Sequence, residues 1–255
     1  MISLTTKQKN ELKELYKKLY NARGEIENKC RGKQHSIFTC QIGKAYADSE
    51  IKFMLIGKCM NGWLYDESET SAIFAARRVE EFITAEGFQW IEEDPSGRQS
   101  NGKGYNLETC RFFTYSRTFF EKLTEPAKEQ YTRARIWQDY IVQSDLYKIS
   151  PKSKGNPGAP AQRAQKDICL ALLKKEIEIL KPTHILFATN VEWLFDEIKG
   201  ELGKPSGKYN HIKLTGHYLN AKVLVTPHPA SARPYGIKKD DYAEECVKAF
   251  EELDK

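Results

Sequence analysis

Four short apolar segments limit most strongly what this chain can fold into. Each contains a run of consecutive apolar residues, as expected of strands that are buried on both faces of a parallel sheet. The segments are residues 51–56, 140–148, 184–188 and 223–225. The segments between these strands would form the helices that cover the two faces of such a sheet.

The intervening segments have the period of amphipathic helices. Apolar stripes cover 72–83 and 168–180, and Pro182 ends the second helix because a residue before proline avoids the α region. Further helices are predicted at about 115–123, 127–137, 191–198 and 242–253. Strands that alternate with helices predict an α/β protein, a three-layer α/β/α fold with a mostly parallel central sheet.

The N-terminal segment carries its own helix signal. Thr5 and Gln8 have the spacing of a capping box, and apolar residues recur after them at helical period. We expect this helix to pack outside the main sheet, so that residues 1–48 form an N-terminal helical extension. Residues 49–255 then form one α/β domain. Two polar stretches within it, 92–106 and 151–160, are predicted to be loops.

The charge of the chain is only mildly positive. Lys and Arg number 40 against 35 Asp and Glu, a formal net charge of +5 over 255 residues. This excess permits a polyanionic partner without requiring one. No apolar stretch has the length of a membrane span, and the first residues lack the apolar core of a signal peptide. We therefore expect a soluble cytoplasmic monomer that does not contact membranes.

The six cysteines form no CxxC pair. Their spacing does not encode a zinc ribbon or a compact iron–sulfur motif, although distant cysteines can converge in a fold. We expect reduced thiols, no metal site and no cofactor. The cysteines are Cys30, Cys40, Cys59, Cys110, Cys169 and Cys246.

Unusual polar residues follow three of the predicted strands. In open α/β sheets ligands bind beyond the carboxyl ends of the strands. The three segments to consider are therefore 57–63, 144–147 and 226–233.

The third segment holds a histidine, His228, between two prolines. Such a backbone is stiff and cannot easily continue as helix or sheet, so the direction of the imidazole is fixed at low entropic cost. Two interpretations stay open from the residues alone: a functional imidazole, or one that caps the following helix or bonds a carbonyl group. His184, which lies within an apolar strand, is interpreted as a core histidine.

The first segment begins with a glycine turn. Gly57 lets backbone amides approach a ligand closely, and Gly62 allows a sharp turn away. Asn61 could position a water molecule or the edge of a base. Cys59 could be a thiol nucleophile or a small buried residue, and no base is recognisably paired with it.

At these three segments the chain resembles the uracil-DNA glycosylase superfamily. FMLIGKCMNGW resembles its first motif, and VLVTPHPASARP resembles its second, in which His-Pro-Ser follows a strand. YIVQSDLYKISPKSKGNPGAP and EILKPTHILFA resemble the strand, proline-rich loop and following strand between them. The resemblance runs from about Ile51 to the end of the chain and implies the uracil-DNA glycosylase-like fold.

The resemblance implies base excision in DNA repair: a hydrolase breaks the glycosidic bond of a damaged or deaminated base that is flipped out of the stack. His228 would donate a hydrogen bond to the base oxygen as charge develops, and Asn61 would hold the attacking water. Asp145 occupies the position of the base-reading asparagine, and Phe113 would stack on the base. The other substrate-binding positions implied are Gly57, Lys58, Cys59, Met60, Gly62 and Ser231.

The partner implied is DNA, single- or double-stranded. A basic rim of lysines and one arginine would meet its phosphates, and the loop with Arg233 and Tyr235 would enter the gap left by the flipped base. The residues expected to bind DNA are Lys148, Lys152, Lys154, Arg233 and Tyr235, with Lys58 also on the rim.

The chain departs from the family pattern at several positions. Cys59 stands where a water-positioning Asp or Asn is common, and Met60 stands where proline is usual. Asp145 replaces an asparagine, and an ionised carboxylate only accepts hydrogen bonds, so it would prefer a base edge rich in donors. Cys169 matches one ligand position of the members that hold an iron–sulfur cluster, but Ile149 stands at another, so no cluster is expected.

Two other classes of function therefore remain open. A catalytically inactive relative would bind nucleic acid or a nucleobase-like ligand without cleaving it, which the altered first motif favours. An α/β protein whose polar loops bind an unrelated small molecule is the third alternative.

Overall fold

In the computed structural model, residues 1–30, 33–60, 69–85, 87–88, 110–125, 137–153, 155–230 and 236–255 are described. The chain forms two compact units, each assembled from three separate segments. Unit 1 contains Met1–Gln41, Gly57–Glu86 and Ser144–Leu180. Unit 2 contains Ile42–Ile56, Gly87–Gln143 and Lys181–Lys255. No helix in the described part of the chain is long and apolar enough to cross a membrane.

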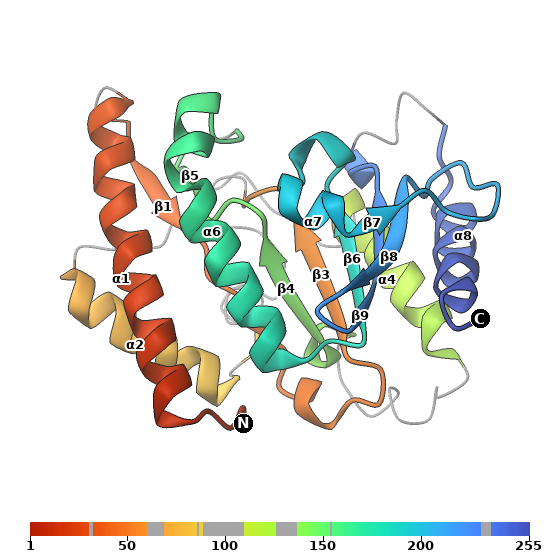
Figure 1. Cartoon of the computed structure of the whole chain (residues 1–255), viewed down its shortest axis with the longest axis horizontal. Coiled ribbons are helices and arrows are strands. Elements are labelled where there is room, and N and C mark those ends of the chain that lie inside the picture. The colour runs from red at the N-terminus through yellow and green to blue at the C-terminus, as the bar shows by residue number, and fades with distance from the viewer. Residues whose placement is uncertain are drawn as a thin grey trace. The chain divides into compact units, whose positions relative to one another are not determined.

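A mixed seven-stranded sheet, partly parallel and flanked by helices, makes this an α/β protein (Figure 1). Its strand order is β2-β4-β3-β6-β9-β8-β7. The strands are β2 (Gln41–Ile42), β3 (Phe53–Gly57), β4 (Ile141–Asp145), β6 (His184–Ala188), β7 (Leu202–Gly203), β8 (Leu214–Tyr218) and β9 (Ala221–Thr226). The predicted α/β class is thus confirmed.

Parallel pairing of β3, β6 and β9 forms the centre of the sheet. Phe53 of β3 pairs with His184 of β6, which pairs with Lys222 of β9. These three strands are the predicted ones at 51–56, 184–188 and 223–225, and their side chains are buried almost throughout. Strands β6 and β9 are not staggered, so their last residues, Ala188 and Thr226, are paired.

The sheet is mixed because β8 and β7 add to β9 in antiparallel order. Tyr218 pairs with Ala221, so a two-residue turn joins β8 to β9. Both turn residues have positive φ, 49° at Leu219 and 68° at Asn220, as the tightest hairpins require. Neither β8 nor this hairpin was expected from the sequence.

In unit 2, α4 (Arg111–Leu123) and α8 (Lys239–Glu252) pack against each other and cover one face of the sheet. Phe119 of α4 lies 5.4 Å from Phe53 of β3 and 5.8 Å from Phe250 of α8, measured between ring centroids. Aromatic contacts at these separations are favourable beyond the area they bury. The sequence predicted this helix at about 115–123, and in the structure it begins four residues earlier, at Arg111.

Unit 1 is built around three helices, α1 (Thr6–Lys29), α2 (Ser71–Thr84) and α6 (Ala159–Leu180). The first helix contacts both of the others, as Figure 1 shows. A two-stranded antiparallel sheet of β1 (His35–Ile37) and β5 (Ile149–Pro151) completes the unit.

The helix signal at the N-terminus is confirmed. The Thr5 side chain accepts from the Gln8 backbone N–H at 3.2 Å, and the Gln8 side chain accepts from the Thr5 backbone N–H at 2.9 Å. Helix α1 buries Leu12, Tyr16 and Leu19 within unit 1, to which Met1–Gln41 belong.

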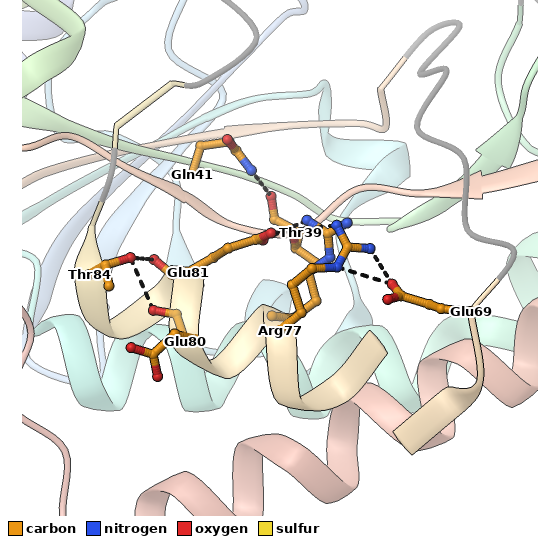
Figure 2. A network of polar contacts seen from close by, with 8 residues as sticks. Thr39, Gln41, Glu69, Arg77, Glu80, Glu81 and Thr84 are labelled. Carbon is orange, nitrogen blue, oxygen red and sulfur yellow. Dashed lines mark hydrogen bonds and ion pairs between the residues drawn. The ribbon is translucent and has the colours of Figure 1, made fainter. Parts of the chain in front are cut away.

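Figure 2 shows polar contacts in and around α2. Arg77 donates to Glu69, which precedes the helix, and lies 3.6 Å from Glu81 one turn later. The Thr84 hydroxyl donates to the carbonyl oxygen of Glu80 at 3.1 Å, and Gln41 donates to that of Thr39 at 3.0 Å. Partly exposed ion pairs of this kind each contribute little to stability.

Other predicted elements differ in extent. The strand expected over 140–148 is shorter, β4 (Ile141–Asp145), and β5 follows it as a separate strand. Residues 191–198 form η4 (Val191–Trp193) and the start of α7 (Asp196–Gly200). Two more short 3-10 helices are η1 (Tyr46–Asp48) and η3 (Trp137–Tyr140). The loop at 92–106 and most of the helix at 127–137 lie outside the described residues.

Two glycines in the fold are expected to respond oppositely to alanine. A Cβ at Gly43 would lie 2.3 Å from the backbone oxygens of Gln138 and Asp139, so Gly43→Ala should lower the free energy of unfolding by about 2 kcal/mol or more. Gly24, inside α1, has nothing within 4 Å of that position. Gly24→Ala should raise stability by about 0.5–1 kcal/mol. Urea denaturation measures both, and a tolerated Gly43→Ala would contradict this packing.

Candidate functional site

His228 follows β9 in unit 2, and two hydrogen bonds hold it, one through its backbone N–H and one through its imidazole ring. Its backbone N–H donates to the side-chain oxygen of Asn190, in the turn after β6. Its ring nitrogen Nδ1 accepts from the backbone N–H of Ala230 at 3.1 Å. A ring nitrogen that accepts carries no proton, so the proton of the neutral imidazole is on Nε2. The loop therefore sets the tautomer in which Nε2–H is a donor.

An aromatic ring fixes the plane of this imidazole. Phe112, in the first turn of α4, is stacked on His228 with ring centroids 5.5 Å apart and an interplanar angle of 20°. The residue expected from the sequence to stack on a base is its neighbour Phe113, which is buried and meets Phe112 edge-on at 5.1 Å. Phe112 thus contacts the histidine, and stacking of Phe113 on a base stays a prediction.

Asn190 binds the loop that contains His228, and its own backbone is strained. Its φ of 69° and ψ of 155° lie in a region that is essentially restricted to glycine. Its backbone N–H donates to the Thr226 carbonyl oxygen at 2.9 Å, and its side-chain nitrogen donates to Glu192 at 2.7 Å. Together with the bond from His228, these contacts tie the ends of β6 and β9 to the histidine loop.

A pocket of about 770 Å³ opens beside this loop, a volume within the usual range of small-molecule sites. It lies beyond the carboxyl ends of β6 and β9, and none of the predicted site residues is among those that line it. Its lining residues are Asn190, Val191, Glu192, Asn210, His211, Lys213, Pro227 and Ile237.

In unit 1 the first two predicted segments come together. The backbone N–H of Leu146 donates to the Gly57 carbonyl oxygen at 2.9 Å, and that of Tyr147 to the Lys58 carbonyl oxygen at 3.0 Å. The Gly57 backbone N–H bonds the carboxyl group of Asp145. Gly57, Lys58 and Asp145 are therefore neighbours, as the positions of their strands predicted.

Lys148 was expected on a basic rim, and this prediction is wrong. Its side chain is 0% exposed and forms an ion pair with Glu176 of α6, with 2.9 Å between Nζ and Oε1. It also donates to the Ser144 hydroxyl at 2.7 Å, which in turn donates to Glu176 at 2.7 Å. A lysine enclosed in this way cannot contact a phosphate.

Asp145 is buried beside this pair, with 2% of its surface exposed. The pKa of its carboxyl group is raised to about 8, chiefly by burial and also by Glu176, while Lys148 and the Gly57 amide oppose this rise. Its Oδ2 atom has no hydrogen-bond partner among the described residues. The raised pKa favours the neutral carboxyl group rather than the ionised acceptor considered from the sequence.

Cys59 is not an activated thiol. Burial raises the pKa of its thiol well above the ordinary value, the Asp145 carboxylate raises it further, and Sγ donates to the Asn156 side chain at 3.2 Å. Met60, which follows it, is buried. Cys59 is half-buried, and its raised pKa and the hydrogen bond to Asn156 give no support to the nucleophile among the two interpretations that the sequence left open.

Several predicted site residues lie outside the described part of the chain: Asn61, Gly62, Lys154, Ser231, Arg233 and Tyr235. Lys58 and Lys152 of unit 1 are half-buried, so each presents part of its side chain to solvent. Among the described residues, no group of three or more His, Cys, Asp or Glu side chains is placed to hold a metal ion.

Three residues of these clusters were missed from the sequence. Phe112 adjoins the residue that was chosen, and helix phase alone could have distinguished the two. Asn190 follows a predicted strand directly, so the strand-end rule could have found it. Glu176 gave no signal, because it lies in the middle of a helix, 28 positions from Lys148.

Comparison with known proteins adds no assignment. No protein-family model matches the chain, and no curated protein matches it significantly.

Two substitutions of Asn190 should separate its strain from its hydrogen bonds. Asn190→Ala and Asn190→Gly lose the same side-chain bonds, but only glycine adopts this backbone conformation without strain. We expect the glycine variant to be about 1 kcal/mol more stable than the alanine variant in urea denaturation. Equal stabilities would contradict the strained geometry.

Asp145→Asn should stabilise the fold in a pH-dependent way. Between about pH 4 and about pH 8 the folded protein keeps a proton on Asp145 that the unfolded chain releases, so wild-type stability falls as pH rises. The advantage of asparagine should grow by at most about 1.4 kcal/mol per pH unit across this window. Urea denaturation at several pH values measures it.

The exposed Asp167 of α6 supplies the control for that experiment. Asp167→Asn should shift stability by a small amount that changes little over the same window. A stability difference for Asp145→Asn that is constant with pH would contradict a neutral Asp145.

Proposed function

We propose that this protein is a uracil-DNA glycosylase-like hydrolase with the corresponding three-layer α/β/α fold. It would cleave the N-glycosidic bond of a damaged or deaminated base that is flipped out of DNA. The proposal rests on the sequence resemblance at three strand ends and on the geometry of the His228 loop.

The state of His228 is the observation that carries the proposal. In glycosidic bond hydrolysis water adds to the anomeric carbon, the carbon–nitrogen bond breaks, and the departing base gains negative charge on its oxygen. A neutral imidazole whose Nε2–H is a donor, with its plane set by Phe112, can stabilise that charge without itself losing a proton. The water gives its proton to solvent or to the released base.

A second candidate is a nucleobase-binding protein that does not cleave. The observation that favours it is Cys59, which stands at the position of a water-binding carboxylate or amide but is a neutral thiol bonded to Asn156. Under this alternative the same base would bind and the glycosidic bond would stay intact.

Replacing His228 should abolish base excision. Oligonucleotides that contain uracil, hypoxanthine or xanthine, single- and double-stranded, are incubated with protein and assayed for cleavage at abasic sites. Because one preorganised donor to a developing oxyanion contributes about 10²–10³ in rate, His228→Ala should be at least about 100-fold slower than wild type.

The exposed His217 of β8 provides the matched control, and His217→Ala should keep the wild-type rate. Equal background from wild type and His228→Ala on every substrate would eliminate the hydrolase. In that case, DNA or base binding that weakens as salt rises would identify the second candidate.

A further inference from the structure

The pocket of unit 2 has no role in the proposed reaction. Its volume of about 770 Å³ suits a small molecule, and it lies beyond the carboxyl ends of β6 and β9, where open α/β sheets bind ligands. Every described residue that lines it belongs to the segment Lys181–Lys255 of unit 2, and His228 is not among them. The pocket is therefore a candidate site for a second ligand.

One wall of the pocket consists of Asn210, His211 and Lys213, which precede β8. Glu245 of α8 accepts hydrogen bonds from the Asn210 side chain at 3.2 Å and from the His211 backbone N–H at 2.8 Å. The backbone N–H of Lys213 donates to the Val225 carbonyl oxygen at 2.8 Å, and its ammonium group donates to the Asn210 carbonyl oxygen at 3.0 Å. These bonds anchor the wall to α8 and to the sheet, and they hold the charge of Lys213 at the pocket.

A second wall follows β6 and consists of Asn190, Val191 and Glu192. The Asn190 side chain donates to the Glu192 carboxylate at 2.7 Å and accepts from the His228 backbone N–H. The backbone of Asn190 has a φ of 69° and a ψ of 155°, and residues in such costly conformations cluster at ligand-binding sites. This wall therefore supplies a carboxylate whose position is fixed.

Apolar side chains complete the pocket. Pro227 follows β9, and Ile237 comes shortly before α8. The Tyr115 hydroxyl of α4 donates to the Ile237 carbonyl oxygen at 2.6 Å, which fixes the backbone there. Together with Val191, these residues offer a surface on which a flat ring can pack.

The chemistry of the walls indicates the class of ligand. Lys213 and His211 can donate hydrogen bonds to an anionic group, and the ammonium of Lys213 also attracts its charge. The Glu192 carboxylate accepts only, as does the acidic residue that binds the ribose hydroxyls in dinucleotide-binding folds. Lys213 and Glu192 are both exposed, so a ligand that enters from solvent can reach them. An anionic group, hydroxyl groups and a flat ring occur together in a nucleotide.

We propose that this pocket binds a free ribonucleoside monophosphate, with its phosphate at Lys213, its ribose hydroxyl groups at Glu192 and its base against the apolar surface. A nucleotide within a DNA strand fits less well, because it has no pair of ribose hydroxyl groups to donate to the carboxylate. The inference goes beyond base excision and does not depend on it, since it uses neither the His228 ring nor the segments around Gly57 and Asp145.

Calorimetric titration with AMP, GMP, CMP and UMP, one at a time, tests the pocket. Wild type should bind at least one of them, and Lys213→Met should bind it at least about tenfold more weakly because the charge-assisted bond to phosphate is lost. Lys213→Arg keeps the charge and should retain most of the affinity. Lys208 is an exposed lysine between β7 and β8 that does not line the pocket, so Lys208→Met should bind as wild type does.

The 2′-deoxy form of the same nucleotide tests the contact with ribose. Wild type should bind the ribonucleotide at least about tenfold more tightly than the deoxy form. Glu192→Gln can still accept from Asn190 but lacks the charge, so it should bind the two forms with more nearly equal affinity. Glu197→Gln, on the exposed part of α7, should keep the wild-type preference.

Urea denaturation of each variant without ligand separates a lost contact from a damaged fold. Unchanged stability with weaker binding supports the site. Failure of wild type to bind any of the four nucleotides, wild-type affinity in Lys213→Met, or equal affinity of wild type for the ribo and deoxy forms overturns the inference. Binding of a single-stranded oligonucleotide that needs Lys213, without binding of mononucleotides, would assign the pocket to DNA and also overturn it. Base excision, present or absent, changes none of these outcomes.

Discussion

Parallel pairing of β3, β6 and β9 is the constraint on which the rest of unit 2 depends. Three level strands, buried on both faces, present their carboxyl ends along one edge, and the register sets Ala188 beside Thr226. The turn after β6 and the loop after β9 must therefore meet, and Asn190 makes the connection with two hydrogen bonds, to Thr226 and from His228. The direction of the His228 imidazole follows from that connection and from the ring of Phe112.

Unit 1 depends on a different kind of interaction. Its interior contains charge, and polar side chains there depend on one another. Lys148 pairs with Glu176, and both bond Ser144, while the neighbouring Asp145 has a buried oxygen without a hydrogen-bond partner among the described residues. In a polar network of this kind, the burial and charge of one residue depend on several others. A single motif position therefore does not predict them.

The sequence predicted what depends on local patterns. Runs of apolar residues located β3, β6 and β9, the spacing of Thr5 and Gln8 located the start of α1, and two prolines marked the His228 loop. The sequence did not predict features that depend on contacts between residues far apart in the chain. The hairpin of β8 has neither strand alternation nor a glycine in its turn, and a lysine in a basic segment gives no sign that Glu176, far along the chain, will bury it. The strain at Asn190 likewise arises from contacts that only the folded strands provide.

The division of each unit among three segments of the chain has a consequence for folding. Unit 1 lacks α6 until residue 180 has been made, and unit 2 lacks α8 until the residues up to Glu252 are present. Neither can close early during synthesis, and both depend on contacts between residues distant in sequence, which are slow to form. Strand β3 can pair with β4 once residue 145 has been made, but its neighbour on the other side, β6, is complete only at residue 188.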